Sequence, residues 1–288
     1  MQSISWNYFE WNRSLMFHNF SEHRHIAKII DNHRIQRLPS CIIIGVKKGG
    51  TRALISFLKE HPQIAVAKKE VHYFDRNENF ELGLNWYESQ MPPSFSNQIT
   101  IEKSPFYFVS NFTPERIFKF NPTVKLLLIV RDPILRINSD FGQARLRRPH
   151  SSINLSYILF DENRKVNEHA YIMQPSRYAY NLRRWLRYFP LKSIHVIDGE
   201  KFIKENPFSE LHLIEDFLDI ENFFKSNHFY FDDSKGFFCS VQNGCLGKSK
   251  GRNAKSFLTD ADVLTLRRYF RPLNLEFSKL VNRSFRWF

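Results

Sequence analysis

The stretch IIIGVKKGGTRALISFL, residues 42–58, joins a continuous apolar run to a segment with helical spacing through a loop rich in glycine and lysine. Gly45 and Gly50 are separated by four residues and Thr51 follows, which nearly matches the Walker phosphate loop, G-x-x-x-x-G-K-[ST]. The lysine expected between Gly50 and Thr51 is missing, and two lysines lie inside the loop instead. The pattern predicts a strand, a loop that binds a phosphate-bearing ligand, and a helix whose N-terminus favours an anion. An ordinary glycine turn with surface lysines is the alternative.

The rest of the chain alternates apolar strands with helices. Strands are predicted at 40–46, 124–130 and 193–199, and an extended segment at 61–67. Helices are predicted at 51–60, from Asp132-Pro133 onward, at 177–189 and at 261–270. This alternation indicates an α/β fold with a mainly parallel central sheet flanked by helices on both faces. We expect one domain at 38–288, preceded by a stem or peripheral extension at 1–37, in which 25–35 has helical spacing.

The bulk composition limits the function classes. The chain has 288 residues, is 42% hydrophobic and 16% aromatic, and carries a formal charge of +13. General disorder is excluded, and the basic excess favours an anionic partner: nucleic acid, acidic lipid, or a sulfated or carboxylated glycan. A solvated basic surface is the alternative. No run reaches the roughly 18 apolar residues of a membrane span, and the N-terminus lacks a signal-peptide core, so the sequence by itself reads as cytosolic.

Two features point instead to an oxidising compartment. Cys239 and Cys245 enclose a short loop, and a bridge there would contribute about 2 kcal/mol of stability. Cys41 is expected to be a buried thiol that opens the first strand. Five asparagines head N-x-[ST] sequons: Asn12, Asn19, Asn111, Asn154 and Asn282.

A second group of chemically active residues lies in KKEVHYFD, residues 68–75. In an extended chain Glu70 and His72 point to one side, which predicts a general base with a supporting partner. A charged strand edge is the alternative. Lys103 follows a short apolar run in IEKSPFYF and is expected to face the same cleft.

The second predicted strand ends in Arg131, and Ser139 lies in the helix that follows. A nucleotide triphosphatase would place a magnesium-binding acid at such a strand end. Arginine suits a second phosphate rather than a metal, so this position argues against a kinase.

Five motifs in order, GVKKGGTRAL, KEVHYFD, EKSPFYF, LLLIVRDP and SKGRNA, resemble the heparan sulfate glucosamine 3-O-sulfotransferases from about Pro39 to the C-terminus. The resemblance implies a sulfotransferase fold related to the P-loop kinases. It also implies 3′-phosphoadenylyl sulfate as the donor, heparan sulfate as the acceptor, and direct in-line transfer without a metal. One departure is Lys47, where many members of the family have arginine.

The resemblance assigns roles to individual residues. Glu70 would be the general base, Lys48 would stabilise the leaving group, and His72, Lys103 and Asp75 would complete the catalytic set. The donor would be bound by Lys47, Lys48, Gly49, Gly50, Thr51, Arg52, Arg131, Ser139 and a late loop of Lys250, Gly251, Arg252, Asn253 and Ala254, braced by a Cys239–Cys245 bridge. The acceptor would contact Lys69, Glu70, Val71, His72, Tyr73, Phe74, Asp75, Lys103, Ser104, Pro105, Gln143, Arg147, Arg184 and Trp185.

Other functions stay open at this point. Another glycan N- or O-sulfotransferase and a catalytically silent heparan-binding module share most of these features. A small-molecule kinase is disfavoured because the Walker lysine after Gly50 is missing. A nucleic-acid binder is disfavoured because no nucleic-acid motif accompanies the basic charge. The resemblance implies a Golgi-lumen glycoprotein of glycosaminoglycan biosynthesis, with membrane association only through a segment not present here.

Overall fold

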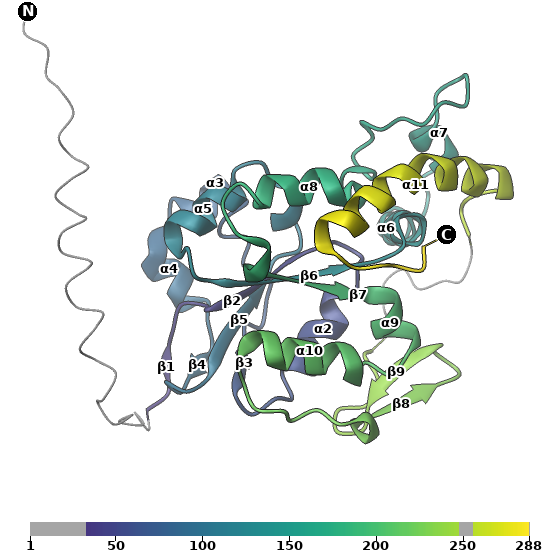
Figure 1. Cartoon of the computed structure of the whole chain (residues 1–288). Helices are drawn as coiled ribbons and strands as arrows, with labels where there is room; N and C mark the ends of the chain where they lie inside the picture. Colours follow the sequence, from purple (N-terminus) through teal and green to yellow (C-terminus); the bar gives the residue numbers. More distant parts are fainter. Residues whose placement is uncertain (1–32, 248–255, 288) are drawn as a thin grey trace, which may run out of the picture.

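A five-stranded sheet forms the centre of the computed structural model, which describes residues 33–247 and 256–287 (Figure 1). Every neighbouring pair of strands is parallel. The spatial order is β3 (Ile64–Val66), β5 (Ile99–Lys103), β2 (Cys41–Gly45), β6 (Lys125–Val130) and β7 (Ile194–Asp198). The predicted α/β fold with a mainly parallel sheet is confirmed.

The continuous apolar strands result from burial on both faces of the sheet. In β2, Ile42 and Ile44 belong to one hydrophobic cluster, whereas Cys41 and Ile43 belong to another on the opposite face. Successive residues of a strand point to opposite sides, so a strand covered on both faces needs an apolar residue at every position. Cys41 is the buried free thiol that the sequence predicts.

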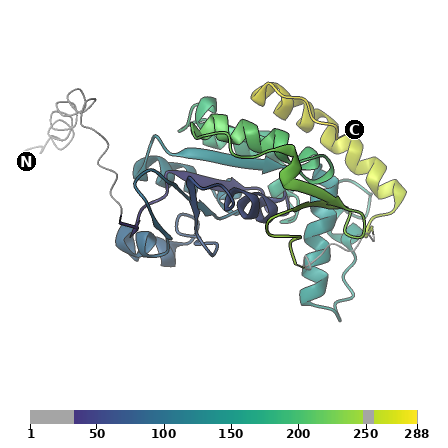
Figure 2. The same cartoon turned by 90° about the horizontal axis from the view of Figure 1, so that it is seen from below.

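Helices cover both faces of the sheet (Figure 1). One face carries α3 (Asn77–Phe80), α4 (Gly83–Ser89), α5 (Thr113–Phe120), α8 (Tyr178–Trp185) and the C-terminal α11 (Asp260–Val281). The other face carries α2 (Thr51–Leu58), α9 (Gly199–Lys204) and α10 (Phe208–Leu218). A third cluster joins α6 (Pro133–Arg147), α7 (Leu155–Leu159) and α11, and in Figure 2 α6 is the long teal helix that extends beyond the strands.

Two small antiparallel pairs complete the fold. β1 (Ile35–Gln36) pairs with β4 (Pro93–Ser94), although these first residues lie in the range predicted as a peripheral extension. β8 (Phe229–Asp232) and β9 (Phe237–Ser240) form a hairpin, and the predicted Cys239–Cys245 bridge closes the turn after it.

Several elements differ from the predicted bounds. β5 was not predicted as a strand, because its sequence, ITIEK, carries two charged residues. The last helix runs on to Val281 with Pro272 inside it, and α8 ends at Trp185. Most of the segment 25–35 lies outside the described residues, and Ile35 belongs to β1. Among the helices of the described ranges, none has the length and apolar character required to cross a bilayer.

Candidate active site

The loop between β2 and α2 forms a tight backbone turn under the carboxyl end of the sheet. Gly50 has a φ of 119°, and Lys48 adopts the left-handed region with a φ of 68°. A Cβ on Gly49 would lie 2.5 Å from the carbonyl oxygen of Ile129, so only glycine fits beside β6. These features bring the loop backbone against the end of the neighbouring strand.

The start of α2 faces open space. Its N-cap is Gly50, which has no side chain that could accept hydrogen bonds from the first N–H groups of the helix. Gly50, Thr51 and Arg52 line a cavity in front of this helix terminus. Free N–H groups at a helix N-terminus and the helix dipole together favour an anion there.

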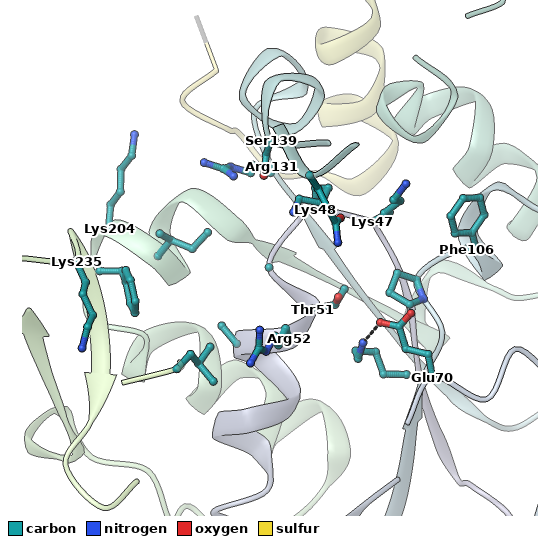
Figure 3. A pocket seen from close by; sticks show the side chains of 18 of the residues that line it. Lys47, Lys48, Thr51, Arg52, Glu70, Phe106, Arg131, Ser139, Lys204 and Lys235 are labelled. Atoms are coloured by element: carbon teal, nitrogen blue, oxygen red, sulfur yellow. Dashed lines mark hydrogen bonds and ion pairs between the residues drawn. The ribbon is translucent and has the colours of Figure 1, made fainter. Parts of the chain in front are cut away.

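The cavity has a volume of about 730 Å³ and is strongly basic (Figure 3). Its cationic lining residues are Lys47, Lys48, Arg52, Arg76, Lys103, Arg131, Arg147, Lys204 and Lys235. Glu70 is the single carboxylate among the described lining residues. Such a site attracts a polyanionic ligand and leaves one defined place for a base.

Glu70 lies in an ion-paired cluster at one side of this cavity. Its carboxylate accepts a hydrogen bond from the Lys103 ammonium, drawn as a dashed line in Figure 3. The second oxygen, Oε2, lies 3.5 Å from Nε2 of His72. On its other side, His72 Nδ1 lies 3.0 Å from Oδ2 of Asp75. The chain therefore lines up Lys103, Glu70, His72 and Asp75 in one network.

This network changes the acidity of its members. Burial alone would raise the pKa of Glu70, but hydrogen bonds and charges from His72 and Lys103 lower it to about 2. Hydrogen bonds to Asp75 and Glu70 raise the pKa of His72 to about 9. At neutral pH the carboxylate is ionised and the imidazole is protonated.

The segment 68–75 is an irregular loop, so the predicted extended conformation is wrong. His72 has a φ of 53°, which a strand does not contain. Glu70 and His72 still lie close together because the turn at His72, rather than strand alternation, orients them. Asn79 donates hydrogen bonds to the carbonyls of Val71 and His72 and fixes the turn.

Carboxylates hold two cavity cations in place. Lys47 Nζ lies 2.9 Å from Oδ1 of Asp140 on α6, and Arg131 Nε donates to Glu200 at 2.9 Å. The fully buried Arg136 also pairs with Asp140, at 3.0 Å, and so neutralises part of its charge.

Helix α6 forms another wall of the cavity. Ser139, Gln143 and Arg147 all line it, because four-residue spacing places them on one helix face. Pro105 and Phe106, which follow β5, also line the cavity. Nζ of Lys47 lies 5.3 Å from the centroid of the Phe106 ring.

Several residues predicted to contact an acceptor belong to the core instead. Val71, Tyr73, Phe74 and Ser104 are buried, and Trp185 is 0% exposed with its indole N–H donating to the carbonyl of Phe108. A buried indole offers no face to a sugar ring, so the acceptor contact that the resemblance implies for Trp185 is wrong.

Two further predicted acceptor residues lie outside the cavity lining. Arg184 is half-buried and bonded to Asn111, Asn181 and the carbonyls of Phe108 and Val109. Its guanidinium therefore ties α8 to the turn after β5. Lys69 is exposed beside Glu70.

Some cavity residues were missed from the sequence, and some predicted ones lie outside the described chain. Arg76 directly follows the quoted motif, so a longer motif would have included it. Lys204 at the end of α9 and Lys235 at the tip of the β8–β9 hairpin carry no local signal, since long-range packing brings them to the site. The predicted late-loop residues Lys250, Gly251, Arg252, Asn253 and Ala254 lie outside the described residues.

Comparison with known proteins agrees with this geometry. The family model described as "Sulfotransferase domain" matches residues 38–284. A solved sulfotransferase from Alicyclobacillus acidocaldarius superposes with a TM-score of 0.65 at 20% identity, covering 86% of this chain and 98% of that chain. This likeness shows the fold.

Curated relatives are more similar in sequence. Heparan sulfate glucosamine 3-O-sulfotransferase 5 of Homo sapiens and of Mus musculus are each 41% identical over 262 residues, which is 88% of this chain and 75% of theirs. Heparan sulfate glucosamine 3-O-sulfotransferase 3B1 of Homo sapiens is 38% identical over 270 residues, covering 91% of this chain and 68% of its own length. The resemblance drawn from the five motifs is confirmed. The chain is a sulfotransferase-domain protein that belongs to the heparan sulfate glucosamine 3-O-sulfotransferases.

Proposed function

We propose that the protein transfers a sulfuryl group from 3′-phosphoadenylyl sulfate to the 3-hydroxyl of glucosamine in heparan sulfate. One observation carries this proposal: the phosphate-type loop and the Glu70 cluster open into the same basic cavity. The names of the curated relatives support the acceptor and the position of transfer.

The donor fits the loop and its surroundings. Gly49 and Gly50 give the phosphosulfate close access to backbone N–H groups, and Thr51 and Arg52 lie at the first turn of α2. Arg131 and Ser139 lie together on the far side of Lys48, as Figure 3 shows, and would bind the 3′-phosphate. Lys48 would stabilise negative charge on the leaving oxygen.

Glu70 would take the proton of the acceptor hydroxyl. The acceptor oxygen forms a bond to sulfur while the bond from sulfur to the bridging oxygen of the donor breaks, and that oxygen leaves with the electron pair. The products are the sulfated glycan and 3′-phosphoadenosine 5′-phosphate. We propose that lysine charges and backbone N–H groups stabilise this transfer without a metal.

The ion pair with Lys103 regulates the basicity of Glu70. A pKa of about 2 makes a weak base, since Lys103 and protonated His72 both stabilise the carboxylate. A sulfate brought close to Lys103 would compete for the ammonium and raise the pKa of Glu70. Binding of donor and acceptor would thus prepare the base for proton transfer.

The remaining cations suit an extended polyanion. Arg52, Arg76 and Arg147 are exposed at the cavity, and Lys69 lies beside it. They would bind sulfates and carboxylates along the chain, and this affinity should weaken with salt.

We further propose a Golgi-lumen location and a transferase domain at 38–288 with a short N-terminal stem. The Cys239–Cys245 bridge fits an oxidising compartment. Asn111, Asn154 and Asn282, which head sequons, are all exposed and open to glycosylation.

Transfer of labelled sulfate from 3′-phosphoadenylyl sulfate to heparan sulfate, followed by disaccharide analysis, tests the proposal. We expect label on the glucosamine 3-hydroxyl with the unaltered protein and about 10²- to 10⁴-fold slower labelling with Glu70→Gln. Label at another position would identify a different glycan sulfotransferase. Salt-sensitive heparan binding without any transfer would identify a silent binding module.

A further inference from the structure

A buried carboxylate lies directly behind the loop that carries Glu70 and His72. Glu102 is 0% exposed and precedes Lys103 on β5. Because neighbouring residues of a strand point to opposite faces, Lys103 reaches the cavity while Glu102 points into the core. None of the roles proposed above uses this carboxylate.

Hydroxyl groups supply the hydrogen bonds of Glu102. Tyr87 on α4 donates to Oε1 at 3.2 Å, and Ser104 Oγ donates to Oε2 at 3.0 Å. The Tyr107 hydroxyl also hydrogen-bonds to the carboxylate. An ionised carboxylate only accepts, so it fixes the direction of all three hydroxyl protons.

Two of these hydroxyls hold the backbone of the loop. The N–H of His72 donates to Ser104 Oγ at 2.9 Å. The N–H groups of Tyr73 and Phe74 donate to the Tyr107 hydroxyl at 2.9 and 3.3 Å. Each hydroxyl accepts a hydrogen bond from the loop and donates one to Glu102, so three consecutive loop N–H groups depend on one carboxylate.

The loop needs this support at His72. A φ of 53° is unusual for a residue with a side chain, and it persists only where surrounding contacts enforce it. The same turn directs His72 between Glu70 and Asp75.

We propose that Glu102 is a positioning residue for sulfuryl transfer, which holds the 70–75 loop through Ser104 and Tyr107 so that Glu70 faces the acceptor. This inference rests on the proposed function. Replacement by glutamine would break the arrangement, because an amide has only one acceptor oxygen and its NH₂ group must donate. One hydroxyl would then lose its acceptor, and its bond to the loop would weaken.

The arrangement also has a pH signature. Burial raises the pKa of Glu102 to about 7, while hydrogen bonds from Tyr107, Ser104 and Tyr87 oppose the shift and the charge of Asp75 adds to it. The pKa values of Tyr87 and Tyr107 lie well above 10. Those of Glu70 and His72 lie near 2 and 9 without ligands. Because bound donor and acceptor are proposed to raise the pKa of Glu70, a fall in kcat near pH 7 is assigned to Glu102 only where Glu102→Gln abolishes it.

The test compares Glu102→Gln with the control Ser94→Ala in the full chain. The buried hydroxyl of Ser94 on β4 lies 3.0 Å from the hydroxyl of Thr100, which is on the same strand as Glu102. The variant therefore removes a buried hydrogen bond to β5 that does not involve the 70–75 loop. We expect Glu102→Gln to lower kcat by about 10- to 100-fold with little change in KM, as a displaced base does. The fall in kcat below pH 7 should vanish in this variant and persist in the control.

Hydrogen–deuterium exchange gives a second reading that needs no activity. The amides of His72, Tyr73 and Phe74 should exchange faster in Glu102→Gln than in the unaltered protein. In Ser94→Ala their exchange rates should be unchanged. If Glu102→Gln does not fold, Tyr107→Phe takes its place, since it removes the hydroxyl that links Glu102 to the N–H groups of Tyr73 and Phe74 and keeps the ring.

Unchanged protection of these amides together with an unchanged kcat would overturn the inference. So would faster exchange across the whole sheet, which would mark a merely structural carboxylate. If the unaltered protein transfers no sulfate, the proposed function fails, whereas the exchange comparison still decides the role of Glu102.

Discussion

The two sides of the cavity are built by different means. The donor wall, residues 45–52, is a strand, a loop and a helix whose shape depends on the backbone and on Gly49 packed against Ile129. The acceptor wall, residues 68–76, is an irregular loop held by side chains from α3 and from the segment directly after β5. Regular structure presents N–H groups to a phosphate, whereas the base depends on a network of individual side chains.

Within the donor wall, the largest effect is expected at Lys48. Lys48→Ala should lower kcat by about 10²- to 10³-fold, because it removes the charge that we propose stabilises the leaving oxygen. Single-turnover transfer of labelled sulfate measures this. Lys48→Arg keeps the charge and serves as the control, and a normal rate in Lys48→Ala would contradict the donor assignment.

A substitution that disturbs only the backbone of the donor wall should have a smaller effect. The added Cβ of Gly49→Ala meets the Ile129 carbonyl at 2.5 Å, so the loop must shift. We expect about tenfold weaker binding of 3′-phosphoadenosine 5′-phosphate, equal to about 1.4 kcal/mol, by calorimetry. Gly247→Ala, with no atom within 4 Å of its Cβ, should bind normally. Equal binding by both variants would show that the tight loop does not matter.

The ion-paired network of the acceptor wall should make the free energy of unfolding depend on pH. The pKa of His72 is raised to about 9, so between pH 6.5 and 9 the folded protein binds more protons than the unfolded chain. Its contribution to stability is complete below pH 6.5 and is lost as pH rises through 9. The difference in free energy of unfolding between the unaltered protein and His72→Gln should therefore shrink over this window in urea titrations. A constant difference would contradict the ion-paired network.

The smallest catalytic effect is expected at Trp185. Trp185→Phe keeps an aromatic ring but removes the indole N–H, one of the two donors to the Phe108 carbonyl beside Arg184, and leaves a smaller side chain in the core. This should cost about 1–3 kcal/mol of stability. KM for heparan sulfate should stay unchanged, because the indole is buried. Thermal unfolding and steady-state kinetics measure the two quantities. A raised KM with unaltered stability would restore the acceptor contact expected for Trp185.

The same contrast explains which parts could be predicted from the sequence. β2, α2, β6 and the start of α6 follow from apolar runs, glycines and the N-cap Asp132, whose carboxylate accepts from Ile134 N–H at 2.8 Å. These signals are local, and they place the donor wall. The Cys239–Cys245 bridge was predicted for the same reason, since its two cysteines lie close in the chain.

The acceptor wall could not be predicted in this way. β5 is not evident from the sequence because Glu102 and Lys103 are charged, and partners distant in sequence, Tyr87 and Glu70, contribute to satisfying them. The turn at His72 has no glycine to mark it. Apolar spacing alone does not tell a buried Trp185 from one in a cleft, and Lys204 and Lys235 reach the cavity only through the packing of the fold.

The most direct test of the account is to measure donor binding and sulfate transfer on the same sample of Glu70→Gln. The account predicts that affinity for 3′-phosphoadenosine 5′-phosphate is unchanged, while transfer to heparan sulfate falls by about 10²- to 10⁴-fold, as expected for loss of a general base. Transfer near the normal rate would contradict the role of Glu70 and the division of the cavity into a donor and an acceptor wall.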